Sequence, residues 1–157
     1  MWNMDIVIRR SRKRDIFAVQ KLMDLLNHTR ENYFAKENRP FHQRTKQYSR
    51  LNEKNLKREI FLVVESGGVI AGFARGSVDH RSHHKLEKLG YIDEIYVKEE
   101  YRGKGLGKKL LSALAKEFKQ RKCDHIATHT DWENTIAQKL YHSFKMHEVT
   151  VEFWKKL

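Results

Sequence analysis

Apolar residues recur along the first third of the chain in two different periods. Asp5–Arg9 alternates with a period of two, which predicts a short strand. A helix then opens at Arg14 or Asp15, because the apolar positions that follow recur three and four residues apart. We expect its inward side chains to be Ile16, Val19, Leu22, Met23, Leu25 and Leu26. Residues 28–58 are polar and irregular, with a short helix expected within Arg50–Glu59.

The middle of the chain reads as a hairpin followed by a third strand. Ile60–Glu65 and Val69–Val78 are rich in β-branched residues and flank Ser66-Gly67-Gly68, a hairpin turn signal. Asp79–Gly90 is a polar segment with histidines at positions 80, 83 and 84, interpreted as an exposed loop because no second ligand cluster supports a metal site. The next strand is predicted over Tyr91–Val97.

The last third adds two helices and two strands. Leu106–Arg121 is a strongly amphipathic helix, and Asn134–His142 is a second helix with Ile136, Ala137 and Leu140 facing inward. Strands are predicted over His125–Thr130 and His147–Trp154. With six or seven strands and about four helices, the fold class is α/β with a mixed sheet, and residues 1–157 are expected to form one domain.

Composition and charge narrow the function classes. No apolar run approaches the length of a membrane span, and the amino terminus lacks the pattern of a secretory signal, so we expect a cytoplasmic protein without a membrane partner. The single cysteine, Cys123, is interpreted as an inert core thiol. The net charge of +12 would attract polyanions, with its densest cluster at Arg9–Arg14, although a solvated structural face is the favoured interpretation of that cluster.

The segment between the strand at Tyr91–Val97 and the following helix carries the candidate chemistry. Three glycines alternate in Arg102-Gly103-Lys104-Gly105-Leu106-Gly107, where the chain enters the helix. Alternate glycines leave backbone N–H groups uncovered, and at a helix amino terminus such groups attract a phosphate or pyrophosphate. The run matches neither the Walker pattern nor the dinucleotide fingerprint, and a tight turn that only caps the helix is the alternative.

Two motifs resemble the GNAT family of N-acetyltransferases. Arg102-x-x-Gly105-x-Gly107 after a strand that ends in Tyr96-Val97 is similar to that family's acetyl-CoA pyrophosphate loop. Downstream, the family's second pattern is matched by Asn134, Ala137, Leu140, Tyr141 and Phe144. The order of elements is also similar over nearly the whole chain, with Glu99 and Ser143 as mild departures. The resemblance implies a GNAT fold, with a mostly antiparallel sheet that splays beside Tyr91–Val97.

The resemblance also implies how acetyl-CoA would be held, as a co-substrate and without a metal. Ile95, Tyr96 and Val97 would line the pantetheine arm, and a backbone N–H near Val97 would polarise the thioester carbonyl. The pyrophosphate would be bound by the amides of Gly103, Lys104, Gly105, Leu106 and Gly107, with the side chains of Arg102 and Lys104. Lys108 and Lys109 are candidates for the remaining phosphate, with a surface role for one of them as the alternative. Asn134 is a candidate for the cofactor arm or an ordered water, with a helix N-cap as its structural alternative.

The chemistry expected from the resemblance is direct attack by a primary amine in a ternary complex. Tyr141 is the candidate acid that protonates the departing thiolate. Asp93 and Glu94 are the candidate bases, and strand alternation predicts that only one of them faces the cleft. Asp93 is favoured, because polyamine acetyltransferases of the family show a similar stretch with an acid at that position.

The acceptor stays open at the level of the sequence. The acids Asp93, Glu94, Asp131 and Glu133 around the reaction centre favour a cationic small-molecule or polyamine-like amine. A protein amino group is the second alternative. A GNAT-fold protein that binds RNA or acetylates aminoacyl-tRNA is the third, because the molecule as a whole is basic. The oligomeric state is undetermined, with a homodimer as one alternative.

Overall fold

The strands form one five-stranded sheet in the order β1-β2-β3-β4-β5, in a computed structural model that describes residues 5–37, 50–79 and 88–149. The first four strands pair antiparallel, whereas β4 and β5 run parallel. The predicted α/β class with a mixed sheet is therefore confirmed. The strands are Ile6–Arg10 (β1), Ile60–Ser66 (β2), Val69–Asp79 (β3), Leu89–Val97 (β4) and His125–Ala127 (β5).

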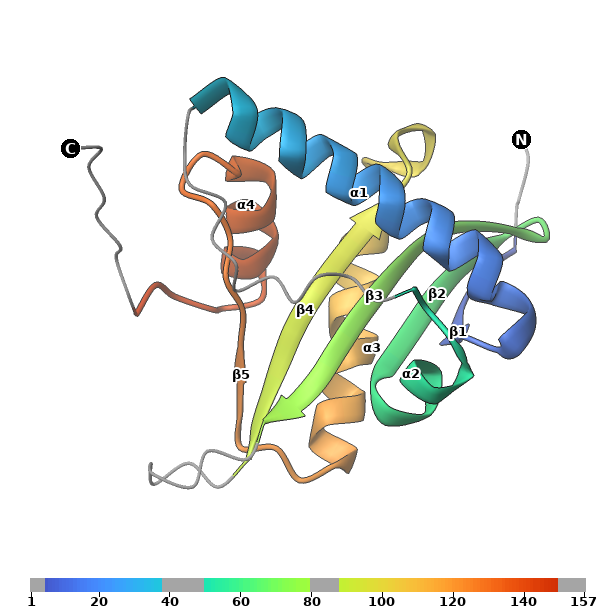
Figure 1. The fold of residues 1–157 in the computed structure, drawn as a ribbon. Coiled ribbons are helices and arrows are strands. Elements are labelled where there is room, and N and C mark those ends of the chain that lie inside the picture. The colour runs from blue at the N-terminus through green and yellow to red at the C-terminus, as the bar shows by residue number, and fades with distance from the viewer. Residues whose placement is uncertain (1–4, 38–49, 80–87, 150–157) are drawn as a thin grey trace.

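Helices cover both faces of this sheet (Figure 1). On one face, α1 packs through Val19, Leu22 and Met23, and α2 through Leu56, on the cluster that holds Phe61 and Phe73 of the sheet. On the other face lies α3. The helices are Ile16–Glu37 (α1), Glu53–Arg58 (α2), Leu106–Gln120 (α3) and Thr135–Ser143 (α4). Short 3₁₀ turns at Lys13–Asp15 and Glu99–Tyr101 precede α1 and α3.

Two glycines allow α3 to approach the sheet closely. The ring of Phe118 is 1% exposed and lies against Gly76 of β3 and Gly90 of β4. A Cβ atom on Gly90 would lie 2.5 Å from this ring, and one on Gly76 would lie 2.7 Å from it, which is closer than real Cβ contacts. Glycine is therefore needed at both positions so that α3 can pack flat on β3 and β4.

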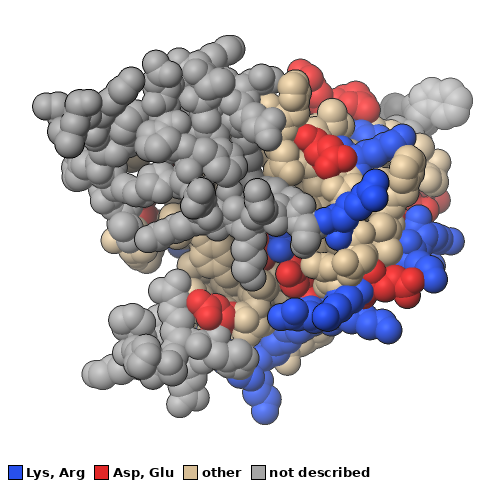
Figure 2. All heavy atoms as spheres, in the orientation of Figure 1, with Lys and Arg blue, Asp and Glu red and all other residues tan. Residues whose placement is uncertain are grey.

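Ion pairs compensate much of the basic cluster at Arg9–Arg14. Arg9 contacts Asp15 at 2.7 Å and Glu65 at 2.6 Å. Lys13 contacts Glu53 at 2.7 Å, and the Arg10 side chain pairs with Glu117 of α3. Figure 2 shows Lys and Arg interspersed with Asp and Glu on the face that it presents. These contacts favour a structural role for the cluster over a polyanion site.

The helix after β1 is longer than predicted. α1 continues to Glu37, through residues that the sequence pattern left irregular. Leu25, expected to face inward, is 50% exposed. A polar segment without apolar periodicity gives no signal of helix, although its residues continue a helix that is already nucleated.

The predicted count of six or seven strands is wrong for the described residues, which hold five. The strand predicted over 147–154 does not form at His147–Val149, because no described strand pairs with these residues; positions 150–154 lie outside the described residues. The predicted strand at His125–Thr130 ends at Ala127, where its pairing with β4 stops.

Ile136, predicted to face inward, is 75% exposed because the first turn of α4 packs on no described core residue. The histidine loop at positions 80–84 also lies outside the described residues.

Candidate active site

The sheet opens between β4 and β5. Their parallel ladder spans three residue pairs, from Leu89↔His125 to Tyr91↔Ala127, whereas β4 runs on to Val97. Thr128, which follows β5, donates its hydroxyl to the carbonyl of Ile92 at 3.0 Å. Beyond that bond, β5 pairs with no residue of β4. The splay predicted beside this strand is therefore present.

The unpaired edge of β4 presents backbone groups at alternate residues. Lys98 donates its N–H to the carbonyl of Ala71 in β3, at 2.9 Å. Because successive residues of an antiparallel strand direct their N–H and C=O groups to opposite sides, those of Ile95 and Val97 point away from β3. The Val97 carbonyl accepts a bond from Arg102 Nε at 2.9 Å. The edge thus offers the N–H of Ile95 and of Val97 to a ligand in the splay.

A β-bulge at Asp93 changes the faces of the two candidate bases. Gly76 of β3 pairs with Ile92 and Arg75 pairs with Glu94, so Asp93 is an extra residue in β4. Ile92 and Ile95 both pack into the core on the α3 side, although residues three apart in a regular strand lie on opposite faces. The two residues between them must share the α1 face. The bulge breaks the regular alternation on which the expectation of a single cleft-facing acid rested, and which of Asp93 and Glu94 faces the cleft stays a prediction.

The two acids share this face with Arg75, whose side chain is 12% exposed. The guanidinium of Arg75 binds Glu59 Oε2 at 2.5 Å and lies 3.6 Å from Glu94 Oε2. Burial lowers the pKa of Arg75, but the hydrogen bond to Glu59 and the charges of Glu59, Asp93 and Glu94 outweigh it and raise that pKa above its ordinary value. The arginine therefore stays charged. Neither Arg75 nor Glu59 belongs to a recognisable motif, so only the cross-strand register identifies them.

The glycine-rich turn leads into α3 with an uncapped amino terminus. Gly103 and Gly105 have φ of +75° and +71°, in the left-handed region that favours glycine. Gly105 is the N-cap of α3 and supplies no side-chain cap. Since the first N–H groups of a helix have no intrahelical partner, those of Leu106, Gly107 and Lys108 are available to an anion at the positive end of the helix dipole. This is the geometry predicted for the turn.

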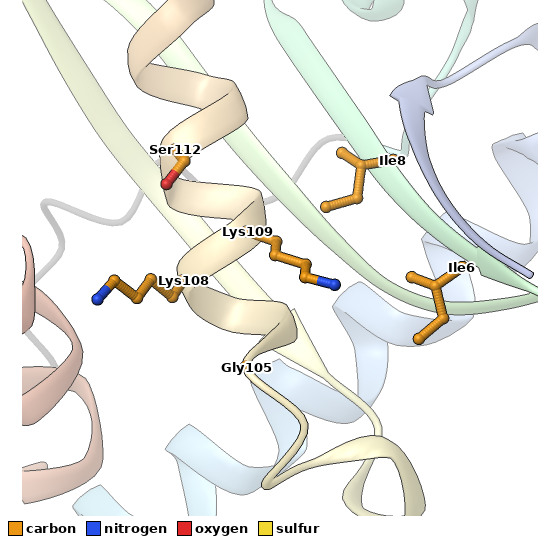
Figure 3. Close-up of a pocket in the computed structure, with 6 residues that line it drawn as sticks. All are labelled: Ile6, Ile8, Gly105, Lys108, Lys109 and Ser112. Carbon is orange, nitrogen blue, oxygen red and sulfur yellow. The ribbon is translucent and has the colours of Figure 1, made fainter.

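The cations of the turn lie in different directions. Arg102 folds back over the end of β4, where its guanidinium lies 5.7 Å from the ring of Tyr96. The Lys104 ammonium lies 5.5 Å from the Tyr101 ring. Figure 3 shows Lys108 extending toward α4, whereas Lys109 extends toward Ile6 and Ile8 of β1. Lys108 thus points to the side of the splay and Lys109 away from it.

A hollow of about 650 Å³ lies between β1 and the start of α3 (Figure 3). Its lining contains no residue of β4, so it is distinct from the splay. The residues that line it are Ile6, Ile8, Gly105, Lys108, Lys109 and Ser112.

The second motif forms the start and the inner side of α4. Asn134 is the N-cap of α4, and its side chain accepts the N–H of Ala137 at 3.1 Å. The helix N-cap, which was the structural alternative for Asn134, is thus present. Tyr141 and Leu140 are half-buried against the core that also holds Ile95 and Val97. Leu140 lies over the first turn of α3, with its methyl group 3.5 Å from the Cβ position of Gly107. The motif therefore brings Tyr141 to the side of the splay.

Tyr91 and His129 form a contact that the sequence patterns do not indicate. The Tyr91 hydroxyl hydrogen-bonds His129 Nδ1 where the ladder between β4 and β5 ends.

The Cys123 thiol is half-buried, and burial raises its pKa, as expected for an unreactive cysteine. Among the described residues, no three His, Cys, Asp or Glu side chains gather as metal ligands, and no helix is long and apolar enough to cross a bilayer.

Comparisons of the sequence with known proteins identify acetyltransferases. The family model described as the acetyltransferase (GNAT) family matches residues 21–146. The aminoglycoside N(6')-acetyltransferase type 1 of Salmonella typhimurium is 28% identical over 97 residues, which are 60% of this chain and 67% of that protein. N-alpha-acetyltransferase 30 of Saccharomyces cerevisiae is 36% identical over 59 residues, or 38% of this chain and 34% of that protein.

Solved structures share the fold over nearly the whole chain. The aminoglycoside acetyltransferase AAC(6')-Iy, in complex with a bisubstrate analogue that contains CoA, has a TM-score of 0.73 and 22% identity, covering 98% of this chain and 99% of that one. Glucosamine-6-phosphate N-acetyltransferase from Arabidopsis thaliana has a TM-score of 0.65 and 18% identity, covering 97% and 98%. At these identities the likeness shows the fold alone. Since the family model matches most of the sequence, the chain belongs to the GNAT family of acetyltransferases and is an acetyl-CoA-dependent N-acyltransferase.

Proposed function

We propose that the protein transfers the acetyl group of acetyl-CoA to a primary amine of a cationic small molecule, by direct attack in a ternary complex. The observation that carries the proposal is the open edge of β4 beside the uncapped start of α3. The backbone N–H groups suited to a pantetheine arm, on β4, thus lie next to the N–H groups suited to a pyrophosphate, at the start of α3. The candidate acid and bases flank the same edge.

In this proposal, acetyl-CoA lies along β4 with its pantetheine arm paired to the N–H groups of Ile95 and Val97. The pyrophosphate rests on the amides of Gly103–Gly107, where the helix dipole favours negative charge. Lys104 and Lys108 add positive charge, and Lys108 extends toward the splay. Arg102 is bound to the Val97 carbonyl, so it holds the turn against the end of β4 and contributes charge at that point.

The reaction forms a C–N bond and breaks a C–S bond. An acid of β4, Asp93 or Glu94, accepts the proton of the substrate ammonium, directly or through water. The neutral amine attacks the thioester carbon, and the N–H of Val97 stabilises the oxyanion. As the intermediate collapses, Tyr141 donates its phenolic proton to the departing thiolate, and the proton that the new amide nitrogen loses restores the phenol through solvent. Asn134 caps α4 and so fixes the helix that carries Tyr141.

Two features favour a small cationic acceptor. The similarity to an aminoglycoside acetyltransferase covers 60% of the chain, whereas that to a protein N-alpha-acetyltransferase covers 38%. Around Arg75, three carboxylates at Glu59, Asp93 and Glu94 face one guanidinium, which leaves the site negative within a cationic protein. A protein amino group is the second candidate, on the basis of the yeast match. RNA is a weaker candidate, because Arg9, Arg10 and Lys13 are held in ion pairs.

A thiol-release assay tests the acceptor. Purified protein and acetyl-CoA are mixed with neamine, spermidine, a peptide with a free amino terminus, or aminoacyl-tRNA, and release of CoA is followed. We expect turnover with neamine or spermidine that exceeds turnover with the peptide. Turnover with the peptide or the tRNA alone would refute the small-molecule acceptor. A missing thermal shift at saturating acetyl-CoA would refute the cofactor site.

A further inference from the structure

β1 lies at the border of the sheet and has one open side. It is the first strand in the order of the sheet, and no other described strand pairs with its outer side. Ser11, which follows β1, donates its N–H to the carbonyl of Phe61 at 2.8 Å, in the register of the β1–β2 ladder. Because successive residues of an antiparallel strand direct these groups to opposite sides, the odd-numbered residues of β1 bond toward β2. The N–H and C=O groups of Ile6 and Ile8 therefore point to the open side.

The same two isoleucines form one wall of the hollow between β1 and the start of α3 (Figure 3). Ile6 is 38% exposed, and Ile8 packs half-buried against the core under α3. Ser112 lines the hollow from α3, and the side chain of Lys109 extends across it toward the isoleucines. Side chains directly opposite one another in paired strands lie on the same face. A strand laid along the open side of β1 would thus direct every second side chain into this hollow.

The flank of α3 that faces β1 is positively charged. Lys116 lies about two helical turns after Lys109 and therefore on the same flank. Both lysines are exposed, and neither forms an ion pair within the part of the chain that the structure describes. Glu117, an acid on this flank, is neutralised by the Arg10 side chain. The hollow thus combines an apolar wall with two cations that are available to carboxylates.

The charged residues of β1 do not guard its open edge. Edge strands are commonly protected by charged side chains that repel an incoming strand. Arg9 is instead bound to Asp15 and Glu65, and Arg10 is bound to Glu117 of α3. The open backbone groups and the hollow beside them therefore lie side by side without a charged barrier from β1.

We propose that β1 is a docking edge for an extended acidic segment of another protein. The segment adds as a strand beside β1, with an apolar side chain against Ile6 and Ile8 and with carboxylates at Lys109 and Lys116. A second copy of this chain fits less well. Antiparallel pairing of two β1 strands would place both α3 helices on one face, with their lysines directed at each other, in a protein of net charge +12. The proposal does not involve the splay and is independent of the proposed function.

A peptide with capped ends, Thr-Glu-Thr-Val-Thr-Glu-Thr, tests the edge by NMR of isotopically labelled protein. We expect saturable binding that slows hydrogen exchange of the Ile6 and Ile8 amides at least about tenfold, because these N–H groups gain partners. The amides of Val7 and Arg9, which already bond toward β2, should change little. The peptide with proline in place of valine should not protect the edge, because proline has no N–H. Binding without protection of Ile6 and Ile8, or no binding at about 1 mM peptide, would overturn the proposal.

Charge reversal on α3 separates a specific site from general attraction to a basic protein. Lys109→Glu should weaken peptide binding about threefold to tenfold. Lys119→Glu is the matched control, because Lys119 lies about three turns after Lys108, on the flank that Figure 3 shows turned toward α4. It should change the affinity less than about twofold. Equal losses in the two variants would show non-specific attraction and refute the site.

Sedimentation of the free protein tests the second copy as the occupant of the edge. We expect a species in which the amides of Ile6 and Ile8 exchange rapidly before peptide is added. A dimer in which these two amides are already protected would assign the edge to a second copy and overturn the proposal. The capped peptide has no free amino group, so these results do not depend on whether any acceptor is acetylated.

Discussion

Gly105→Ala tests the glycine-rich turn without introducing a steric clash. A Cβ atom on Gly105 would have no atom within 4 Å, so the only cost comes from its φ of +71°. Holding an L-residue in this left-handed region costs about 1–2 kcal/mol. The free protein can relieve this strain by moving the turn, but binding a pyrophosphate on the same amides would restore it. Since about 1.4 kcal/mol is tenfold in affinity, we expect acetyl-CoA to bind roughly 5-fold to 30-fold more weakly.

Gly68→Ala provides the matched control. Gly68 lies in the turn between β2 and β3, has a φ of +80°, and likewise has no atom within 4 Å of its Cβ position. Isothermal titration of both variants with acetyl-CoA, together with their thermal unfolding, separates binding from stability. A loss of affinity in Gly105→Ala alone is expected. If its Kd stays within about twofold of the wild type, or if Gly68→Ala weakens binding equally, the turn does not hold the cofactor in this way.

Three further predictions concern packing, charge and catalysis. Phe118→Ala should lower the free energy of unfolding by about 3–5 kcal/mol in urea, because the buried ring fills the space over Gly90. The bond from Arg9 holds the pKa of Asp15 below its usual range, so its stabilising effect is present at neutral pH and is lost as the pH falls through that lowered pKa. Asp15→Asn should therefore lower the Tm at pH 7 and reduce its further fall toward pH 3. Tyr141→Phe should reduce kcat at least about tenfold, with the Kd of acetyl-CoA nearly unchanged; an unchanged kcat would contradict its role as the acid.

Local signals predicted the parts of the site that depend on neighbouring residues. The turn at Gly103–Gly107 needs left-handed glycines next to a helix start, and both features depend on residues that are neighbours in the sequence. The same holds for the hairpin at Gly67-Gly68, where both residues have positive φ. The cap of α4 by Asn134 also needs only residues within one turn.

The parts that were missed depend on partners distant in the chain. The bulge at Asp93 exists because β3 and β4 pair with a shift, and a single strand carries no sign of its partner's register. Arg75 and Glu59 become part of the site only through that pairing. The exposure of Ile136 also depends on which residues pack against α4, because the periodicity of the helix alone predicts that this side chain faces inward.

The splay between β4 and β5 places an unpaired strand edge inside the sheet and not at its border. An unpaired strand edge normally invites a strand of another molecule, because its N–H and C=O groups form a ready template. Here the unpaired edge of β4 is internal to the sheet order, and β5 closes it at the Tyr91↔Ala127 pair. In the proposed function, a backbone template that would be a liability at the outer edge of the sheet is used by the pantetheine arm of acetyl-CoA instead.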